Sequence, residues 1–345
     1  MKKQTHILVI RLSAMGDVAM AATVLRIFVH QNRDVKVTFL SKAFLKPLFA
    51  DIPNVNFYIA DTENKHKGIL GVFKLFRELK KLNFDAIADL HNVLRSKILR
   101  SYFFGLKTAS IDKGRAEKKA LTSFPRKEFK ELKTSHERYA DVFRELDFKI
   151  DLSKPVFPER KELSEEITFI SGEKKPAEKW IGIAPFAQYE TKMYPLDLME
   201  KVIAELNEKQ NIKLFLFGGG KSEIDILSGL EKKYKNVISV AGKLKLAHEL
   251  ALISNLECML AMDSGNAHFA AMLGISTFTL WGNTHPFVGF APFHQLKENC
   301  VLPDLKQFPK IPTSVYGNKK VEGYEEVMRS IETEVVVEKI IENLQ

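Results

Sequence analysis

Short apolar stretches alternate with longer amphipathic ones along nearly the whole chain. In the amino-terminal half this pattern predicts strands at residues 6–12, 35–40, 55–60 and 84–90, and helices at residues 18–29, 69–82 and 136–146. Strands that alternate with helices form parallel sheets, because a parallel pair needs a crossover connection that is usually a helix. The alternation therefore predicts an α/β fold.

A second alternating unit begins near residue 180. It predicts strands at residues 180–185, 213–217, 237–240, 256–262 and 277–280, and helices at about 195–210, 222–234 and 266–273. Between the two units, residues 151–159 contain Pro155 and Pro158 and show little periodicity, which is typical of an extended linker. We therefore expect two doubly wound, Rossmann-like domains that face a central cleft, with ligands beyond the carboxyl ends of the strands.

The expected domain boundaries follow from this pattern. Residues 1–160 form the first Rossmann-like domain, residues 161–322 form the second, and residues 323–345 are helical with a break near Ile331 and Glu332.

Composition narrows the class of protein. With 345 residues, 45% of them hydrophobic and 28% charged, the chain resembles an ordinary globular protein of two domains. The first apolar run covers only residues 7–10, which is too short for a signal peptide, and no run approaches the length of a membrane span. Cys258 and Cys300 provide neither a disulfide framework nor a metal cluster, so a cytoplasmic protein is predicted.

The net charge of +9 is concentrated in residues 95–133, where Asp112, Glu117, Glu128 and Glu131 are the only acidic residues. Such a stretch favours an anionic partner, either an anionic membrane surface or an acidic substrate. Nucleic acid is not expected, because the chain contains no recognised nucleic-acid module and few aromatic residues here. A solvated basic face is the alternative.

Residues 262–268 read MDSGNAH and join a predicted strand to a predicted helix. At such a junction the amides of Ser264, Gly265 and Asn266 lie at the positive end of the helix dipole, where a diphosphate can bind without a metal. In the alternative interpretation, Asp263 or Ser264 only caps the helix.

Residues 11–18 read RLSAMGDV and follow the first strand. They lack the GxGxxG pattern of dinucleotide-binding proteins. Gly16 permits a sharp turn or the close approach of a substrate, and Asp17 lies where a helix begins, with its carboxylate available to the cleft. A plain helix cap is again the alternative for Asp17, and Asp89 is a second, less favoured carboxylate.

Taken together, these motifs resemble glycosyltransferase family 9, the lipopolysaccharide heptosyltransferases. The S-x-M-G-D pattern lies within residues 7–18, D-[ST]-G-x-x-H covers residues 263–268, and LWGNT follows at residues 280–284. The resemblance spans most of the chain. It implies a GT-B fold and an inverting, metal-independent enzyme without cofactor, which transfers a heptose from ADP-heptose to the inner core of lipopolysaccharide.

The resemblance also implies roles for individual residues. Asp17 matches the catalytic base, and Lys192 matches a lysine that contacts the donor diphosphate. The donor-site motif supplies Asp263, Ser264, Gly265 and His268. The first domain would bind the acceptor, the second would bind the nucleotide sugar, and the last helix would cross back to the first domain. Residues 187–190 depart from the family pattern, which leaves the donor sugar open.

Further contacts follow from position. Gly219, in a run of three glycines after a strand, lets the backbone approach the nucleotide, and Glu223 is a candidate partner for its ribose hydroxyls, with a plain tight turn as the alternative. The residues expected to contact the acceptor are Ser13, Met15, Gly16, His91, Arg95 and Arg115.

An enzyme of this family would work on the inner face of the cytoplasmic membrane, with peripheral contact to anionic lipid and an acidic acceptor of the lipid A–Kdo type. Two other classes are compatible with the fold. A nucleotide-sugar epimerase would turn over the donor without an acceptor, and a non-catalytic nucleotide-sugar-binding protein would bind the donor without any transfer.

Overall fold

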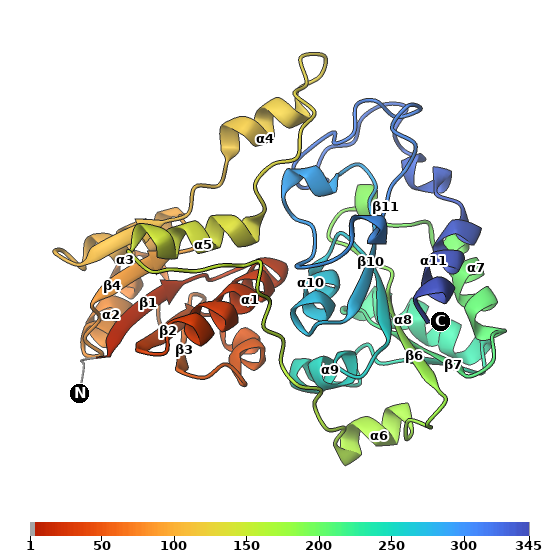
Figure 1. The fold of residues 1–345 in the computed structure, drawn as a ribbon, viewed down its shortest axis with the longest axis horizontal. Helices are drawn as coiled ribbons and strands as arrows, with labels where there is room; N and C mark the ends of the chain where they lie inside the picture. The colour runs from red at the N-terminus through yellow and green to blue at the C-terminus, as the bar shows by residue number, and fades with distance from the viewer. Residues whose placement is uncertain (1–3, 345) are drawn as a thin grey trace. The chain divides into compact units, whose positions relative to one another are not determined.

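The computed structural model describes residues 4–344 and divides into two compact units (Figure 1). Unit 1 contains the chain up to Lys113 together with Ser135–Phe157, and unit 2 contains Gly114–Thr134 together with the chain from Pro158 onward. The break after Phe157 lies inside the predicted linker. The sequence pattern does not predict that Gly114–Thr134 belongs to unit 2. We call this segment the arm.

Unit 1 is built on a five-stranded parallel sheet with the strand order β3-β2-β1-β4-β5. Its strands are β1 Thr5–Ile10, β2 Val35–Ser41, β3 Val55–Ile59, β4 Ala86–Asp89 and β5 Lys107–Ser110. Ile7 of β1 is aligned with Val37 on one side and with Ala86 on the other. Because the chain builds outward from β1 in both directions, the point where the strand order reverses lies between β1 and β4, and a ligand is expected at their carboxyl ends.

Helices cover both faces of this sheet, namely α1 Met15–Gln31, α2 Gly68–Lys80, α3 Leu94–Ser101 and α5 Ser135–Glu145. On one face α1 packs against α5, where the rings of Phe28 and Phe143 stack with their centroids 4.2 Å apart. On the other, α2 and α3 bury Leu75 and Leu99 with Leu8 of β1. Burial on both faces explains why residues 7–10 are apolar without alternation.

Unit 2 has a six-stranded sheet with the order β11-β10-β9-β6-β7-β8, in which every described pair is parallel. The strands are β6 Lys179–Ala184, β7 Ile212–Leu216, β8 Val237–Ser239, β9 Cys258–Met262, β10 Ser276–Leu280 and β11 Cys300–Val301. Here the strand order reverses between β6 and β9. A ligand of unit 2 is therefore expected beyond Ala184 and Met262.

The longer helices of unit 2 are α6 Glu165–Ser171, α7 Leu196–Asn207, α8 Lys221–Lys233, α9 Leu246–Ile253, α10 Gly265–Met272 and α11 Thr333–Leu344. The helical pattern predicted from residue 323 is interrupted. The short 3-10 helix η5 covers Val327–Ser330, and α11 begins only at Thr333. Val336 and Ile340 of α11 join the core of unit 2, where α11 packs against α7 and β9. The expected return of this helix to the first domain stays a prediction.

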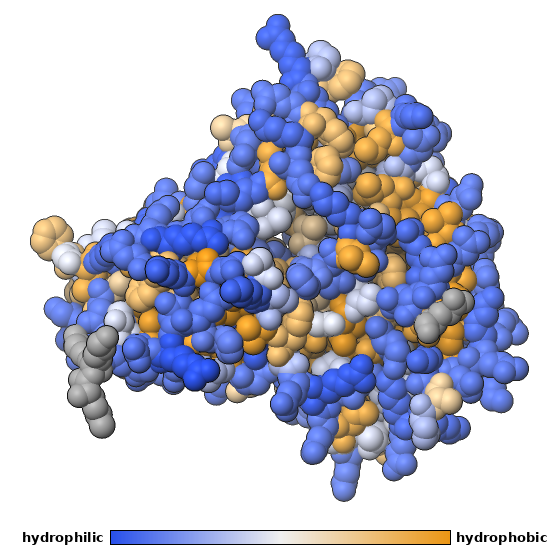
Figure 2. Space-filling model, viewed as in Figure 1, coloured by the Kyte–Doolittle hydropathy of each residue, from blue (hydrophilic) through white to orange (hydrophobic). Residues whose placement is uncertain are grey.

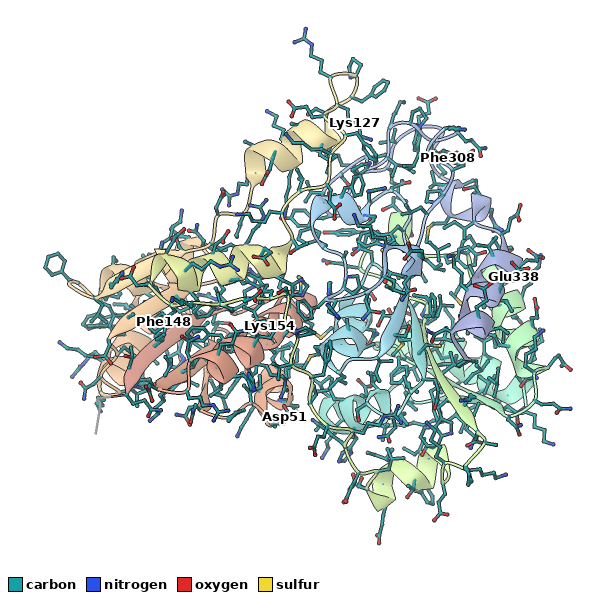
Figure 3. The ribbon with its side chains drawn as sticks, in the orientation of Figure 1. Asp51, Lys127, Phe148, Lys154, Phe308 and Glu338 are labelled. Carbon is teal, nitrogen blue, oxygen red and sulfur yellow. The ribbon has the colours of Figure 1, made fainter. Side chains whose placement is uncertain are left out.

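The arm contains α4 Arg115–Thr122 and packs on unit 2. Leu121 and Leu132 form an apolar cluster with Val288, and the Leu132 amide donates to the Phe287 carbonyl at 3.0 Å. Lys127, labelled in Figure 3, donates its ammonium hydrogens to the Ile311 carbonyl. The arm is therefore an integral part of unit 2.

This packing argues against the alternative interpretation of residues 95–133 as a solvated basic face. The stretch is divided at Gly114 between the two units, and its lysines are not all solvated. Lys118 is only 6% exposed and lies 4.2 Å from the centroid of the Phe290 ring. On the face of the molecule drawn in Figure 2, hydrophilic side chains predominate and apolar ones show between them. Within residues 4–344, no helix is both long and apolar enough to cross a bilayer.

Candidate active site

Asp17 lies at the carboxyl edge of the unit 1 sheet, as the third residue of α1. One carboxylate oxygen, Oδ2, is 2.5 Å from Nη2 of Arg11, and Oδ1 accepts a hydrogen bond of 3.2 Å from the hydroxyl of Tyr139. The Ala14 amide also approaches Oδ2, at 3.4 Å. With 28% of its side chain exposed, Asp17 is held in one orientation and is still open to a substrate.

Gly16 does not form a sharp turn, the first of the two roles predicted for it, and the close approach of a substrate stays a prediction. Gly16 is the second residue of α1 and is not among the glycines with positive φ. The helix begins at Met15, three residues before the predicted start at residue 18, and its N-cap residue Ala14 is extended. Met15 is half exposed at this edge, and Ser13 and Gly16 are partly buried.

Two residues around Asp17 are not identified by sequence reasoning. Arg11 is buried, donates to the Leu90 carbonyl at 2.8 Å and lies 5.8 Å from the centroid of the Tyr139 ring. A charged residue at the end of an apolar strand is a signal that points to Arg11. Tyr139 comes from α5, and no local pattern links it to Asp17.

Asp89, the second carboxylate considered as a base, has a structural role. It is fully buried, accepts hydrogen bonds from the amides of His91 and Asn92 at 2.9 and 2.8 Å, and lies 3.1 Å from Nε of Arg100. These contacts fix the loop that follows β4. Asp89 is therefore not available to an acceptor.

His91 follows β4 at the same edge, and its Nδ1 accepts a long hydrogen bond of 3.4 Å from the Leu12 amide. Burial lowers its pKa to about 4, and the positive charges of Arg11 and Lys113 act in the same direction. His91 is therefore neutral near pH 7 and can contact a substrate as a neutral hydrogen-bonding group.

The residues that are expected to contact the acceptor substrate do not all belong to one unit. Those that follow β1 and β4, and so share the carboxyl edge of unit 1, are Ser13, Met15, Gly16, His91 and Arg95. Arg115, in contrast, is the first residue of α4 in the arm and belongs to unit 2.

In unit 2, the polar turn after β9 is built around an ion pair. Nζ of Lys192 is 3.0 Å from Oδ2 of Asp263, and the Thr284 hydroxyl donates to the same oxygen at 2.9 Å. The exposed fractions of the two charged side chains are only 12% and 7%. The fold brings these two candidate donor-site residues together at the point where the strand order reverses, a contact that the sequence did not predict.

The position of Lys192 depends on two glycines. Lys192 ends the short 3-10 helix η2 Glu190–Lys192, and the Thr191 carbonyl accepts a hydrogen bond of 3.0 Å from the Asn283 amide. A Cβ on Gly282 would lie 2.3 Å from the Thr191 carbonyl oxygen, and a Cβ on Gly317 would lie 2.5 Å from Cγ of Lys192. The absence of a side chain at both positions therefore lets the loops close around η2.

The helix α10 begins directly after this pair, with Ser264 as its extended N-cap residue. The amides of its first turn, which includes Gly265 and Asn266, have no partner within the helix. The buried hydroxyl of Ser264 also has no hydrogen-bond partner among the described residues. His268 is buried one turn further along. This helix start presents several donors beside a lysine, an arrangement suited to an anionic group.

Gly219 and Glu223 lie together after β7. The Gly219 amide donates to Oε2 of Glu223 at 2.7 Å, and a Cβ on Gly219 would meet no atom within 4 Å. The turn itself requires Gly220, which has a φ of +85°. The backbone at Gly219 is therefore open to a ligand, while Glu223 holds the turn in place.

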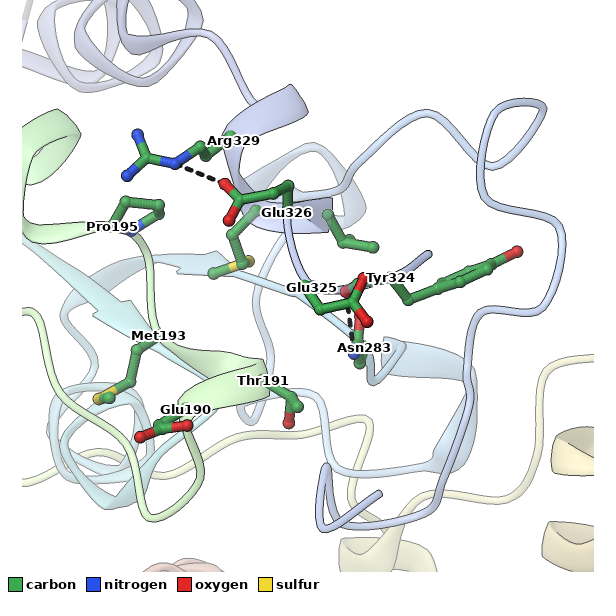
Figure 4. A pocket seen from close by; sticks show the side chains of 11 residues that line it. Glu190, Thr191, Met193, Pro195, Asn283, Tyr324, Glu325, Glu326 and Arg329 are labelled. Atoms are coloured by element: carbon green, nitrogen blue, oxygen red, sulfur yellow. Dashed lines mark hydrogen bonds and ion pairs between the residues drawn. The ribbon is translucent and has the colours of Figure 1, made fainter. Parts of the chain in front are cut away.

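A small cavity of about 110 Å³ lies beside η2 (Figure 4). Figure 4 shows Glu326 paired with Arg329 on one side and Asn283 bonded to Tyr324 on the other. Neither Lys192 nor Asp263 lines it. Its volume is below the range of about 300–1,000 Å³ of small-molecule sites, so this cavity is not the expected nucleotide site.

Metal-ligating side chains do not gather in the described part of the chain. Within residues 4–344, no group of three or more His, Cys, Asp or Glu side chains is placed to hold a metal ion.

The sequence of the chain matches a known protein family. Residues 72–318 match the model of glycosyltransferase family 9 (heptosyltransferase). The chain belongs to this family. It is therefore a glycosyltransferase, and the resemblance described from its motifs is confirmed.

Two curated proteins are similar over most of their length. The chain is 25% identical to the lipopolysaccharide core heptosyltransferase OpsX of Haemophilus influenzae, in an alignment that covers 96% of this chain and 94% of that protein. It is 26% identical to lipopolysaccharide heptosyltransferase 1 of Campylobacter coli, over 81% of this chain and 84% of that protein.

Solved structures share the fold. A family 9 glycosyltransferase from Veillonella parvula aligns with a TM-score of 0.77 at 18% identity, covering 100% of this chain and 98% of that one. The heptosyltransferase WaaC of E. coli, solved with ADP, aligns with a TM-score of 0.69 at 16% identity, covering 98% and 100%. The predicted fold class, an α/β GT-B protein with two Rossmann-like domains, is confirmed.

Proposed function

We propose that this glycosyltransferase moves a heptose from ADP-heptose to the inner core of lipopolysaccharide, with inversion at the anomeric carbon. The observation that carries the proposal is the pair of Lys192 and Asp263 at the start of α10, in a member of the heptosyltransferase family. The names of both curated relatives, which are lipopolysaccharide heptosyltransferases, support the same substrate class.

The donor side must stabilise a diphosphate that gains negative charge as it leaves. Lys192 supplies one positive charge, and the amides of the first turn of α10 supply donors that are already oriented. Asp263 holds the lysine until the phosphate oxygens approach, and its carboxylate then accepts hydrogen bonds from hydroxyl groups of the sugar. Gly219 and Glu223 contact the nucleoside part of the donor.

The acceptor side must remove one proton. The acceptor oxygen forms its bond to the anomeric carbon while the bond from that carbon to the diphosphate oxygen breaks, and the hydroxyl proton passes to Asp17. A carboxylate is a much weaker base than an alkoxide, so the proton moves late, once the hydroxyl has become acidic. Arg11 and Tyr139 keep the carboxylate oriented for this step.

No metal ion or cofactor is part of this proposal, because Lys192 and the α10 amides supply the stabilisation that a divalent cation would give to the leaving group. The test is direct. Activity should be the same in the presence and absence of a strong chelator, and a loss that Mg²⁺ restores would contradict the proposal.

We also propose that the protein is cytoplasmic and acts at the inner face of the cytoplasmic membrane, on an acidic acceptor of the lipid A–Kdo type and not on nucleic acid. Arg95 and Lys113 lie near the carboxyl edge of unit 1, where burial chiefly lowers the pKa of His91 and their positive charge adds to the effect. The same positive field favours the binding of an anionic acceptor.

The decisive experiment incubates the purified protein with ADP-, UDP-, GDP- and dTDP-linked sugars, with and without a lipid A–Kdo acceptor. We expect release of ADP from ADP-heptose only when the acceptor is present. Conversion of the donor without the acceptor would indicate an epimerase instead. Donor binding without any turnover would indicate a non-catalytic protein.

A further inference from the structure

The first turns of α2 and α3 in unit 1 expose several large apolar side chains. Ile69 is 66% exposed, Leu70 is 85% exposed and Leu94 is 75% exposed, while Phe73, one turn along α2, is 44% exposed. We call these four residues the α2–α3 rim. Single exposed apolar residues are common, but a group of this size on neighbouring helices often marks an interaction site.

The topology of the sheet brings the rim to the edge that holds Asp17. In a parallel sheet, the helix that follows a strand begins at the carboxyl end of that strand. Helix α2 follows β3 and α3 follows β4, so the first turns of both helices lie at the carboxyl edge of unit 1. The two helices are neighbours, since the rings of Phe73 and Tyr102 lie 5.5 Å apart.

Basic residues flank the rim, and the two carboxylates that precede α2 are engaged: Asp61 accepts from the Asn64 and Lys65 amides, and Glu63 lies 2.9 Å from Nζ of Lys42. Lys67, Lys74 and Lys97 are exposed, and no acidic residue occurs between His91 and Lys107. The only carboxylate of α2, Glu78, is engaged by Lys65 at 2.9 Å and by His66 at 3.2 Å. The rim therefore combines exposed apolar groups with an excess of positive charge.

This combination fits an anionic phospholipid surface. The apolar side chains can enter the boundary between headgroups and acyl chains, while the lysines contact phosphate groups. A symmetric contact between two copies of this chain would instead place the same basic residues against one another, because the same patch would face itself. The charge pattern therefore disfavours a homodimer through this face.

We propose that the α2–α3 rim inserts into the surface of an anionic phospholipid leaflet. Binding in this way brings the carboxyl edge of unit 1, with Asp17 and His91, to the membrane surface where a lipid-anchored acceptor is held. The choice of acceptor rests on the proposed function, whereas the binding of the rim to lipid does not. The arm, in which Lys118 and Lys127 are engaged within unit 2, is not part of this proposal.

Vesicle binding by the full-length protein tests the proposal. The probes are vesicles of phosphatidylethanolamine with phosphatidylglycerol, and vesicles of phosphatidylcholine alone. The variants are Leu70→Glu and, as a second change in the rim, Leu94→Glu. The matched control is Phe104→Glu, since Phe104 is 99% exposed in the same unit but lies after α3 and just before β5, at the opposite edge of the sheet.

We expect the wild-type protein to bind the anionic vesicles and to bind phosphatidylcholine poorly. Leu70→Glu and Leu94→Glu should each weaken binding to anionic vesicles roughly tenfold or more, because a buried leucine side chain contributes at least about 1.5 kcal/mol. Phe104→Glu adds the same charge and should change binding less than about twofold. Unchanged melting temperatures would show that the exposed substitutions leave the fold intact.

Four outcomes would overturn the proposal. These are unchanged binding in both rim variants, an equal loss in the Phe104 control, equal affinity for phosphatidylcholine, or a dimer in the absence of vesicles that Leu70→Glu dissociates. A failure of the proposed function can be distinguished, since it would abolish sugar transfer to a soluble, deacylated acceptor and leave the vesicle results unchanged.

Discussion

The carboxylate of Asp17 and the guanidinium of Arg11 form an ion pair of 2.5 Å at the carboxyl edge of unit 1. Arg11 is itself buried, and its guanidinium donates to the Leu90 carbonyl. The position of Arg11 is therefore fixed, and Arg11 in turn fixes the orientation of Asp17. An arginine in this position fixes one oxygen of the carboxylate, and 28% of the Asp17 side chain stays exposed. This arrangement suits a group that must accept a proton from a bound hydroxyl.

Replacement of Asp17 by Asn should remove the base and preserve the shape of the side chain. We expect kcat to fall roughly 10²- to 10⁴-fold, the usual contribution of a general base, with little change in donor affinity. Steady-state kinetics and calorimetric titration with ADP measure the two quantities. A small and equal loss of activity and folded stability would instead indicate that Asp17 only caps α1.

Tyr139→Phe tests whether the orientation of Asp17 matters. The change keeps the ring beside Arg11 and removes the hydrogen bond of 3.2 Å to the carboxylate. A hydrogen bond to a charged group contributes about 1.5–3 kcal/mol, so kcat should fall roughly 10- to 100-fold while the KM for the donor is unchanged. Tyr58→Phe is the matched control, because it removes a similar bond to Glu78 within the same unit. An equal loss of kcat in both variants would contradict a positioning role.

Lys192→Met should affect both stability and donor binding. Among the described residues, the change leaves the Thr284 hydroxyl as the hydrogen-bond partner of the buried Asp263 carboxylate, and such a broken pair costs about 3–5 kcal/mol. The double variant Lys192→Met/Asp263→Asn should recover most of this stability, because no buried charge is left unpaired. It should not recover binding of ADP. Thermal unfolding and calorimetry separate the two effects, and recovered ADP affinity in the double variant would show that the pair is purely structural.

The positions of most strands are predictable from local apolar patterns. Strand β2 and helix α8 lie within one or two residues of the predicted ranges, because long buried strands and amphipathic helices carry strong periodicity. Strand β5, of sequence KTAS, and helix α9, apolar on most sides, were not predicted. The first is short and polar at a sheet edge, and the second lacks the polar face that marks a surface helix.

Candidate site residues could be named from the sequence only where they belong to local motifs. Asp17, Asp263 and Lys192 lie in or beside recognisable motifs, but Tyr139 approaches Asp17 from a helix distant in sequence. The packing of the arm on unit 2 could not be predicted for the same reason, because the hydrogen bond from the Leu132 amide to the Phe287 carbonyl joins residues that are distant in sequence. Neither contact leaves a periodic signal that a single sequence reveals.

His285 should make the stability of unit 2 depend on pH. It is 2% exposed, its Nδ1 accepts from the Phe287 amide at 3.1 Å, and burial, with a smaller effect of Lys127, lowers its pKa to about 4. Between about pH 6.5 and pH 4, the unfolded chain takes up a proton that the folded chain does not, so stability falls as the pH is lowered. The slope from one such group is at most about 1.4 kcal/mol per pH unit.

His285→Asn keeps an acceptor at this position and removes the titration. Urea unfolding at pH 4.5 and pH 7 should therefore show a smaller difference for this variant than for the wild type. His30→Asn, a change of an exposed histidine on α1 of unit 1, serves as the control and should leave the difference unchanged. A wild-type difference that persists in His285→Asn would assign the pH dependence to other groups.

Leu132→Ala tests whether the arm stabilises unit 2. Leu132 is 4% exposed and packs with Leu121 and Val288, so its truncation should cost about 2–5 kcal/mol. Hydrogen exchange should then show faster exchange in unit 2, beginning at Phe287–Gly289, with little change in unit 1. Leu79→Ala, in the core between α2 and the sheet of unit 1, should give the opposite distribution. If Leu132→Ala accelerated exchange in unit 1 alone, the arm would be part of unit 1, to which the chain on either side of it belongs. Lys118 and Lys127 would then not be held by unit 2 and could contribute to a solvated basic face.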